Sequence, residues 1–371
     1  MQKIKKIFCF ALDIFTLSRP FSSKMPKDIV IIKMGGLGDL AISLGLISDY
    51  LKQNTNESFL LICDSRWRLV SECFLGTRAK VVGIEVQQFS TDLRYRKKIY
   101  NEFKLIDAKQ IILPTISRSF WVEDALASHI SAVEKISFAD DCVNKSRVLN
   151  RLSNLFYDRL IPRKDEFEFY NLTNFFITLG LKDSHYLLPH VEGFKIDLPM
   201  GIQGPYVLLS LGAGSSKRAW NVAKFCEVSR NLPSSQQIVF SGFCDEAGIN
   251  EIEKLSMERK VINLANKTSV MDLVALVSHS TLVIANESGP IHLSVALGKK
   301  FICLSNGNHY KRFHPYQGTR GIYLYPDGFL KKFKRDSVFR KEVAQEISWD
   351  VNSISTEKVL KILNAGVGDV S

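Results

Sequence analysis

The sequence has no apolar run that approaches the roughly 20 residues needed to span a bilayer as a helix, which excludes an integral membrane bundle. Cysteines are few, seven in 371 residues, and no two of them form a C-x-x-C pair. This scatter is typical of small buried thiols in a reducing compartment. It excludes a disulfide-rich scaffold and disfavours a structural zinc site, and we expect no bound metal.

Two common nucleotide-binding signatures are also missing. No segment has the G-x-x-x-x-G-K-[ST] spacing of a P-loop, and neither glycine-rich segment reads G-x-G-x-x-G. No acidic residue closes the second expected strand in the manner that binds a dinucleotide ribose, and Asp64 is the nearest candidate. A nicotinamide dehydrogenase is therefore poorly supported.

Positive charge is in excess. Lys and Arg total 49 against 38 for Asp and Glu, which gives a net charge of +11. Such a protein favours anionic partners: nucleic acid, anionic lipid or phosphorylated substrates. Basic clusters at Arg94–Lys98 and Lys331–Lys341 face either such a partner or only solvent. Because no nucleic-acid-binding motif accompanies them, we expect no nucleic-acid partner.

The first 27 residues are a basic N-terminal extension with six basic residues and one acid. The basic start and apolar stretch resemble a signal peptide, but Asp13 interrupts the stretch and no small-residue cleavage site follows. Two interpretations remain: an amphipathic segment on an anionic membrane surface, or an extension that frays or packs on the body of the protein.

Strands and helices are expected to alternate in each of two halves of the chain. The length also suggests at least two domains, at roughly 150 residues per domain. In the first half, the β-branched run 28–33 predicts a buried strand, 34–39 a glycine turn, and the spacing from Leu40 to Leu51 a helix. Residues 141–170 look polar and irregular. The same order begins again at Pro205. We predict an α/β protein with two Rossmann-like, doubly wound parallel-sheet domains, 28–195 and 205–350, that face a central cleft.

Three segments carry candidate chemistry. In the first, Gly35, Gly36 and Gly38 allow a sharp turn before Asp39, which acts either as a helix cap or as a general base. In the second, small residues from Gly212 to Ser216 precede two cations, Lys217 and Arg218, which form either a phosphate cradle or an ordinary exposed turn.

The third segment is Asn286–Pro290. Its Ser and Pro predict a helix start that favours phosphate, and Glu287 can accept hydrogen bonds from a sugar or from loop amides. His292 lies inside the following helix, where a buried, satisfied histidine is the more common outcome. Each segment alone is a weak signal.

Together and in this order, the segments resemble glycosyltransferase family 9, the ADP-heptose:lipopolysaccharide heptosyltransferases. They read IVIIKMGGLGDL (29–40), LGAGSSKRAW (211–220) and NESGPIHLSVALGK (286–299). The resemblance covers roughly residues 28–305. It implies a GT-B fold, an inverting transfer without metal, an acceptor-binding N-terminal domain and a C-terminal domain that holds the nucleotide sugar. It also implies that the segment 351–371 crosses back to the N-terminal domain as a helix and tail.

By resemblance, Asp39 matches the proposed catalytic base, Lys217 or Arg218 the diphosphate-binding cation, and Glu246 an acidic residue near the nucleoside. The full set of expected donor-binding residues is Gly36, Gly38, Gly212, Gly214, Ser215, Lys217, Arg218, Glu246, Glu287, Ser288, Gly289 and His292. Two departures bear on donor identity. The family usually has Asp where this chain has Glu287, and Asn221 replaces a Pro, so that Arg218 keeps the usual spacing to Trp220.

We therefore expect a metal-independent heptosyltransferase that uses ADP-heptose as donor substrate, needs no other cofactor, and modifies a phosphorylated glycolipid such as the lipopolysaccharide core. We expect a monomer in the cytoplasm, with peripheral contact at the cytoplasmic face of the inner membrane. Two alternatives stay open. One is a GT-B transferase that uses another nucleotide sugar, for example a UDP-sugar, for surface polysaccharide. The other is a nucleotide-binding module without catalysis.

Overall fold

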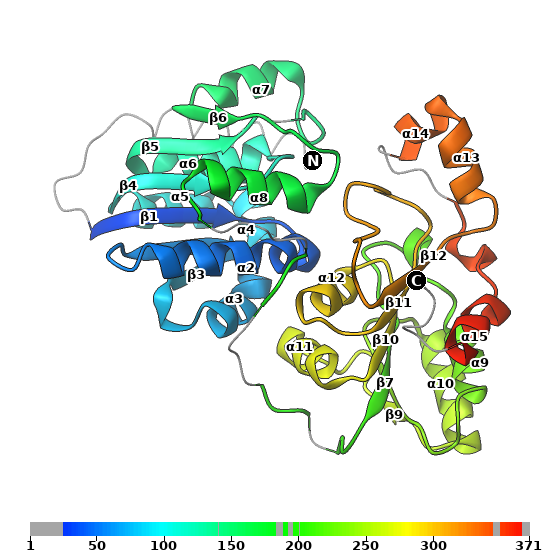
Figure 1. Cartoon of the computed structure of the whole chain (residues 1–371). Helices are drawn as coiled ribbons and strands as arrows, with labels where there is room; N and C mark the ends of the chain where they lie inside the picture. The colour runs from blue at the N-terminus through cyan, green and yellow to red at the C-terminus, as the bar shows by residue number, and fades with distance from the viewer. Residues whose placement is uncertain are drawn as a thin grey trace. The chain divides into compact units, whose positions relative to one another are not determined.

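The computed structural model describes residues 25–139, 141–182, 188–191, 196–199, 201–343 and 349–365 (Figure 1). The chain divides into two compact units. Unit 1 comprises Met1–Leu40, Leu46–Asp165 and Asn171–Ser184, and unit 2 comprises Ala41–Gly45, Glu166–Tyr170 and His185–Ser371. Most of the N-terminal extension, residues 1–24, lies outside the described part of the chain, and so do the two interpretations of it. The last three residues of the extension begin the first strand, β1 (Met25–Lys33).

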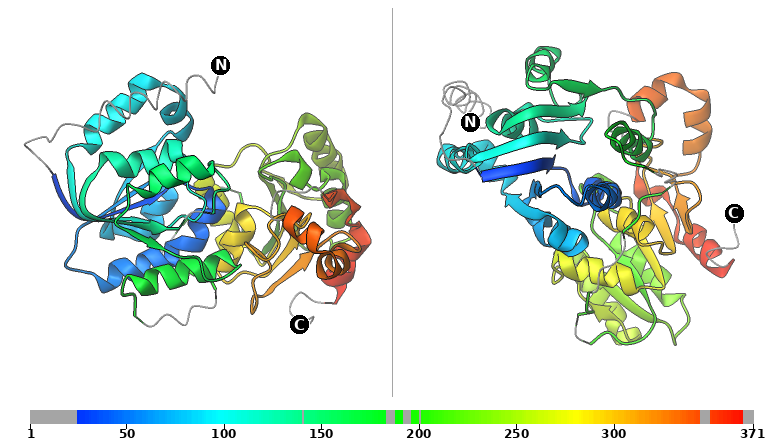
Figure 2. Two further views of the ribbon diagram at one scale, coloured as in Figure 1. Left: turned by 90° about the horizontal axis from the view of Figure 1, so that it is seen from above. Right: turned by 60° about the vertical axis from the view of Figure 1, so that its left-hand side comes forward.

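Unit 1 holds a six-stranded parallel sheet with the strand order β3-β2-β1-β4-β5-β6. Its strands are apolar because the central ones are covered on both faces by helices (Figures 1 and 2). The strands are β1 (Met25–Lys33), β2 (Phe59–Asp64), β3 (Lys80–Ile84), β4 (Ile106–Leu113), β5 (Ser131–Phe138) and β6 (Arg159–Ile161). The helices are α2 (Leu37–Gln53), α3 (Arg68–Leu75), α4 (Val86–Thr91), α5 (Leu93–Phe103), α6 (Ala125–His129), α7 (Arg147–Asn154) and α8 (Glu168–Thr178).

Unit 2 repeats this topology in a second six-stranded parallel sheet, in the order β12-β11-β10-β7-β8-β9. Its strands are β7 (Tyr206–Ser210), β8 (Gln237–Ser241), β9 (Ile262–Asn263), β10 (Leu282–Asn286), β11 (Phe301–Leu304) and β12 (Gly321–Leu324). Its helices are α9 (Val222–Arg230), α10 (Glu246–Glu258), α11 (Val270–His279), α12 (Gly289–Ala296), α13 (Phe329–Arg335), α14 (Ser337–Val343) and α15 (Thr356–Asn364). The two doubly wound parallel sheets confirm the predicted α/β fold class.

The C-terminal helix α15 packs into unit 2. α15 packs against α9, and the buried residues Val351, Ile354 and Val359 belong to the hydrophobic core of unit 2. The indole of Trp220 also donates a hydrogen bond to the carbonyl of Ile354, at 2.9 Å. This apolar face therefore places α15 in the core of unit 2.

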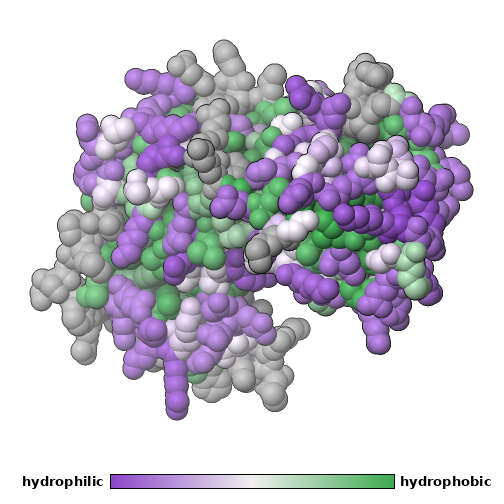
Figure 3. Space-filling view, turned by 90° about the horizontal axis from the view of Figure 1, so that it is seen from below, coloured by the Kyte–Doolittle hydropathy of each residue, from purple (hydrophilic) through white to green (hydrophobic). Residues whose placement is uncertain are grey.

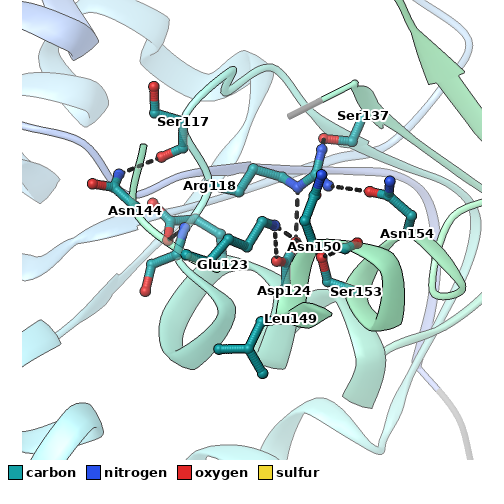
Figure 4. A network of polar contacts seen from close by, with 12 residues as sticks. Ser117, Arg118, Glu123, Asp124, Ser137, Asn144, Leu149, Asn150, Ser153 and Asn154 are labelled. Atoms are coloured by element: carbon teal, nitrogen blue, oxygen red, sulfur yellow. Dashed lines mark hydrogen bonds and ion pairs between the residues drawn. The ribbon is translucent and has the colours of Figure 1, made fainter. Parts of the chain in front are cut away.

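The segment 141–170 is more ordered than its composition suggests, because it contains α7 and β6 and begins α8. Its polar residues are used internally. The fully buried carboxylate of Asp124 lies between the guanidinium of Arg118, at 2.8 Å, and the ammonium of Lys145, at 2.5 Å. Side chains of α7 complete this network: Asn154 accepts from Arg118 at 2.9 Å, as Figure 4 shows. Ser153 accepts from Lys145 at 2.9 Å.

The cysteines agree with the prediction of unpaired thiols. The six in the described residues are free, and four of them are buried: Cys63, Cys226, Cys244 and Cys303. None of the described helices has both the length and the apolar character that crossing a membrane requires.

Removing the charge of Asp124 tests the buried network. In Asp124→Asn, two buried cations lose their shared carboxylate, so we expect the free energy of unfolding to fall by about 3–5 kcal/mol. The measurement is urea unfolding of the full chain at neutral pH. The control is Glu102→Gln, which removes an exposed pair with Lys98 at 4.0 Å and should change stability by less than about 0.5 kcal/mol. Equal effects of the two substitutions would contradict the role of Asp124.

Candidate functional site

The order of the strands defines one switch point in each sheet, where the chain connections leave in opposite directions. These points lie between β1 and β4 in unit 1 and between β7 and β10 in unit 2. In open α/β sheets, ligands bind outside the carboxyl ends of the strands at such a point. All three sequence motifs follow one of these strands: 34–39 follows β1, 211–218 follows β7, and 287–292 follows β10.

The two loops at the switch point of unit 2 are tied together by a buried amide. Asn286, the last residue of β10, accepts a hydrogen bond from the backbone N–H of Trp220 at 2.9 Å. Its Nδ2 donates to the carbonyl of Leu211 at 2.7 Å. Asn286 thus spans the loop that follows β7, and the loop keeps a fixed position relative to the start of α12.

The guanidinium of Arg218 lies within this pair of loops. Its Nη1 is 3.0 Å from Oε2 of Glu287, and a Cβ built on Gly214 would lie 2.5 Å from its Nη2. A side chain at position 214 would therefore displace the guanidinium. Lys217, by contrast, is exposed, and no described carboxylate pairs with it. Of the two candidate cations, the structure brings Arg218 to the switch point.

Glu287 is buried and held from a second side. Its Oε1 is 3.5 Å from Nε2 of His292, whose Nδ1 is 2.9 Å from the hydroxyl of Tyr316. If Tyr316 donates to Nδ1, the N–H of Nε2 faces Glu287. Burial by itself would raise the pKa of Glu287, but the hydrogen bond from His292 and nearby positive charge, including Arg218, lower this pKa to about 2. Glu287 is therefore an anion that orients Arg218.

Most other predicted donor-binding residues also lie at the carboxyl edge of this sheet. Ser288 is the N-cap of α12, and its hydroxyl lies 3.2 Å from the carbonyl of Gly212. Gly289 begins that helix, and Ser215 precedes a short 3-10 helix that contains Arg218. Glu246 is exposed in the first turn of α10, after β8, apart from the described contacts of Arg218 and Glu287. His292 contacts Glu287 through its Nε2.

The switch point of unit 1 carries Asp39. Asp39 is in the first turn of α2, and its Oδ2 accepts the backbone N–H of Gly36 at 3.0 Å. A Cβ on Gly35 would lie 2.7 Å from the Cβ of Asp39, so this turn requires glycine. The indole of Trp67 donates to the carbonyl of Gly35 at 3.1 Å and fixes the turn from the β2 side. Gly38 lies within the same first turn as Asp39. Asp39 is thus a capping residue by geometry, at a position where a ligand would bind.

A second carboxylate at this switch point was missed by sequence reasoning. Glu123 follows β4 in the π-helical turn Phe120–Asp124, and it accepts the backbone N–H of Ser119 at 3.0 Å. Burial raises the pKa of Glu123 to about 7, with Lys33 as a partly compensating charge. A buried acid with such a pKa at a switch point is a candidate functional group. Only its position after a strand could have indicated it, since no motif surrounds it.

Several other residues also lack a sequence signal or differ from it. Tyr316 orients His292 from 24 residues away. Arg96, inside the basic cluster Arg94–Lys98, does not face a partner: it is buried and donates to the carbonyls of Phe89 and Trp121, both at 2.9 Å. Asp64 is buried and pairs with Arg66 at 2.6 Å, so it is already engaged. Among the described residues, no three His, Cys, Asp or Glu side chains are grouped as a metal site would require.

The low pKa of Glu287 predicts a pH-dependent stability. Its folded pKa lies below the unfolded value, so its contribution is present above about pH 4.5 and disappears as the pH falls towards 2. We expect Glu287→Gln to lower the free energy of unfolding by about 1–3 kcal/mol at pH 7 and by progressively less below pH 4. Urea unfolding from pH 7 to pH 3 measures this. Glu258→Gln, which breaks the exposed pair with Arg230, serves as control and should change little. A Glu287→Gln effect that does not vary with pH would contradict the assignment.

The part of the chain that contains this site is similar to known proteins. Residues 177–342 match the family model "Glycosyltransferase family 9 (heptosyltransferase)". Lipooligosaccharide heptosyltransferase 2 of Campylobacter jejuni is 28% identical over 161 residues, which are 40% of this chain and 50% of that protein. The matched stretch thus spans about half the length of that relative.

Two further proteins resemble the chain over most of its length. The lipopolysaccharide core heptosyltransferase OpsX of Haemophilus influenzae is 21% identical over 334 residues, 86% of this chain and 90% of that protein. The structure of E. coli heptosyltransferase WaaC with ADP aligns with a TM-score of 0.69 at 13% identity, and covers 92% of this chain and 99% of that one. This likeness shows a shared GT-B fold. Residues 177–342, which include the switch point of unit 2, are thus similar to glycosyltransferase family 9.

Proposed function

We propose that the protein is an inverting, metal-independent heptosyltransferase that transfers heptose from ADP-heptose to the lipopolysaccharide core or a related surface glycan. The observation that carries the proposal is the guanidinium of Arg218, held by Glu287 at the switch point of unit 2. A fixed cation beside glycine amides fits a diphosphate. The family and the names of the relatives, all heptosyltransferases, support the sugar and the acceptor class.

In the proposed reaction, unit 2 binds the donor and unit 1 supplies the base. Asp39 takes the proton of an acceptor hydroxyl, and that oxygen forms a bond to the anomeric carbon. The bond from this carbon to the β-phosphate oxygen breaks, and ADP leaves with the electron pair. Arg218 stabilises the charge that develops on the leaving diphosphate, which a fixed cation does without reorganisation. Attack from the face opposite ADP inverts the anomeric centre.

The two carboxylates Asp39 and Glu287 thus have different tasks. Glu287 is buried against His292 and Arg218, so it stays ionised as a positioning group. Asp39 is only partly buried, and its Oδ2 accepts the N–H of Gly36. A reaction of this kind on a lipid-linked acceptor would take place at the cytoplasmic face of the inner membrane.

Nucleotide selectivity tests the donor. We expect isothermal titration of the full chain, without added metal, to show clear selectivity for ADP over UDP, GDP and CDP. Preference for UDP would contradict ADP-heptose and favour a transferase that uses a UDP-sugar. If none of the four nucleotides binds, the enzyme assignment itself fails.

Asp39→Asn tests the base. Asn keeps the hydrogen-bond acceptor for the cap of α2 but cannot take a proton, so the fold should survive. We expect kcat, measured as ADP release with ADP-heptose and a lipopolysaccharide-core acceptor, to fall by about 10²–10⁴-fold, while the Kd for ADP stays within twofold. The control is Asp49→Asn on the same helix, where Asp49 pairs with Lys52, and its turnover should remain normal. Wild-type turnover in Asp39→Asn would rule out Asp39 as the base.

A further inference from the structure

Helix α7 of unit 1 is amphipathic in the opposite sense to a normal surface helix. At about 100° per residue, Asn150, Ser153 and Asn154 share one face, and Val148, Leu152 and Leu155 share the opposite one. The polar face points inward: Asn154 accepts from Arg118, as Figure 4 shows, and Ser153 accepts from Lys145. The apolar face therefore points outward.

Exposure confirms this inverted arrangement. The side chains of Val148, Leu152 and Leu155 are 67%, 43% and 80% exposed, and Val143, just before the helix, is 62% exposed. Single exposed apolar residues are normal on a protein surface, and hydrophobic areas are interspersed with hydrophilic ones on the face drawn in Figure 3. However, four of the twelve large exposed apolar residues of the described part of the chain fall within 143–155, and three of these, Val148, Leu152 and Leu155, form one stripe on α7.

The buried charges explain why α7 cannot rotate about its axis to bury its apolar face. Arg118, Asp124 and Lys145 are fully buried and need polar partners, because an unpaired buried charge is costly. Rotating α7 to bury its apolar stripe would remove Asn154 and Ser153 from this network. The structure therefore holds the stripe outward, where a partner can dock on it.

Charge indicates the kind of partner. Residues 143–155 contain no Asp or Glu, and the exposed Arg147 and Arg151 both lie on one flank of the stripe. Neither arginine pairs with a carboxylate among the described residues. An apolar stripe with a basic flank is the pattern of a helix that lies in the interface of an anionic bilayer.

The size of the stripe favours the same partner. A stable protein–protein interface buries about 800 Å² per partner, with about 20–30 residues on each side. Two exposed apolar side chains on a helix of eight residues, with Leu155 at its C-cap and Val143 before it, do not provide this. An interfacial helix, by contrast, adds to electrostatic attraction that other basic residues also supply. We propose that the outward face of α7 docks on an anionic phospholipid bilayer and inserts Val148, Leu152 and Leu155 between the lipid headgroups.

Only the functional consequence, access to an acceptor embedded in lipid, rests on the proposed function. The binding of α7 to lipid does not depend on the proposed function. Vesicle binding needs neither nucleotide nor acceptor, so a protein that binds ADP but no vesicles would overturn the docking surface alone. A protein that binds vesicles through α7 but no nucleotide would overturn the heptosyltransferase assignment alone.

The main experiment is flotation of the full chain with vesicles of neutral phosphatidylcholine, with or without about one third phosphatidylglycerol. The variant is Val148→Gln/Leu152→Gln/Leu155→Gln, in which Gln keeps a good helix propensity. A matched control, Leu69→Gln/Ile177→Gln/Met257→Gln, alters three helical residues that are 57%, 39% and 82% exposed elsewhere. We expect the α7 variant to bind anionic vesicles about tenfold more weakly than wild type, and the control variant to bind within twofold of wild type.

A second experiment locates the contact, because residues outside α7 also carry charge. Leu152→Trp should add tryptophan fluorescence that bromine-labelled lipid quenches. Leu69→Trp should add fluorescence that the same lipid does not quench. Each is measured against the fluorescence of the four native tryptophans. Arg147→Gln/Arg151→Gln should weaken binding to anionic vesicles only, and reduce its dependence on salt.

Four results would overturn the proposal. They are wild-type protein that does not bind anionic vesicles, an α7 variant that binds as wild type does, equal losses in the α7 and control variants, and a vesicle-bound Leu152→Trp variant whose added emission the lipid does not quench. A concentration-dependent dimer in solution that the α7 variant abolishes would also overturn it, because a second copy of the chain would then cover the stripe.

Discussion

The ion pair between Arg218 and Glu287 is the interaction on which the candidate site depends. An arginine near a surface has many rotamers, and a site that must stabilise a developing charge needs one of them. The ion pair with Glu287 stabilises one rotamer of Arg218, and the absence of a side chain at Gly214 leaves room for its guanidinium. Glu287 can do this because it is itself buried and held by His292, which Tyr316 orients in turn.

This arrangement follows from the topology of unit 2. The loops after β7 and β10 separate at the switch point, and nothing in a parallel sheet holds them together. Asn286 supplies that link through two backbone hydrogen bonds. Unit 1 uses a different device for the same problem, since the indole of Trp67 holds the glycine turn that precedes Asp39. The two units share a strand order and use different side chains to fix the loops that carry the chemistry.

The parallel-sheet fold was predictable because each glycine-rich turn stands between an apolar run and a helical pattern. The positions of Asp39, Arg218 and Glu287 followed for the same reason, since residues after parallel strands gather at one edge. Glu123 and Tyr316 were not predictable: their roles arise from burial and from contacts distant in sequence. The order in 141–170 was also missed. The polar face of α7 packs inward on buried charges, a reversal of the pattern by which helices are recognised.

The central claim is that Arg218, and not its neighbour Lys217, contacts the diphosphate of the donor. Titration of ADP into Arg218→Gln and Lys217→Gln compares the two cations directly, with the wild-type chain as reference. Arg218 is held at the switch point, whereas Lys217 is exposed. The account predicts at least about a tenfold weaker ADP affinity in Arg218→Gln and less than about a threefold change in Lys217→Gln, since hydrogen bonds to charged groups contribute about 1.5–3 kcal/mol. The reverse order, or no loss in Arg218→Gln, would contradict it.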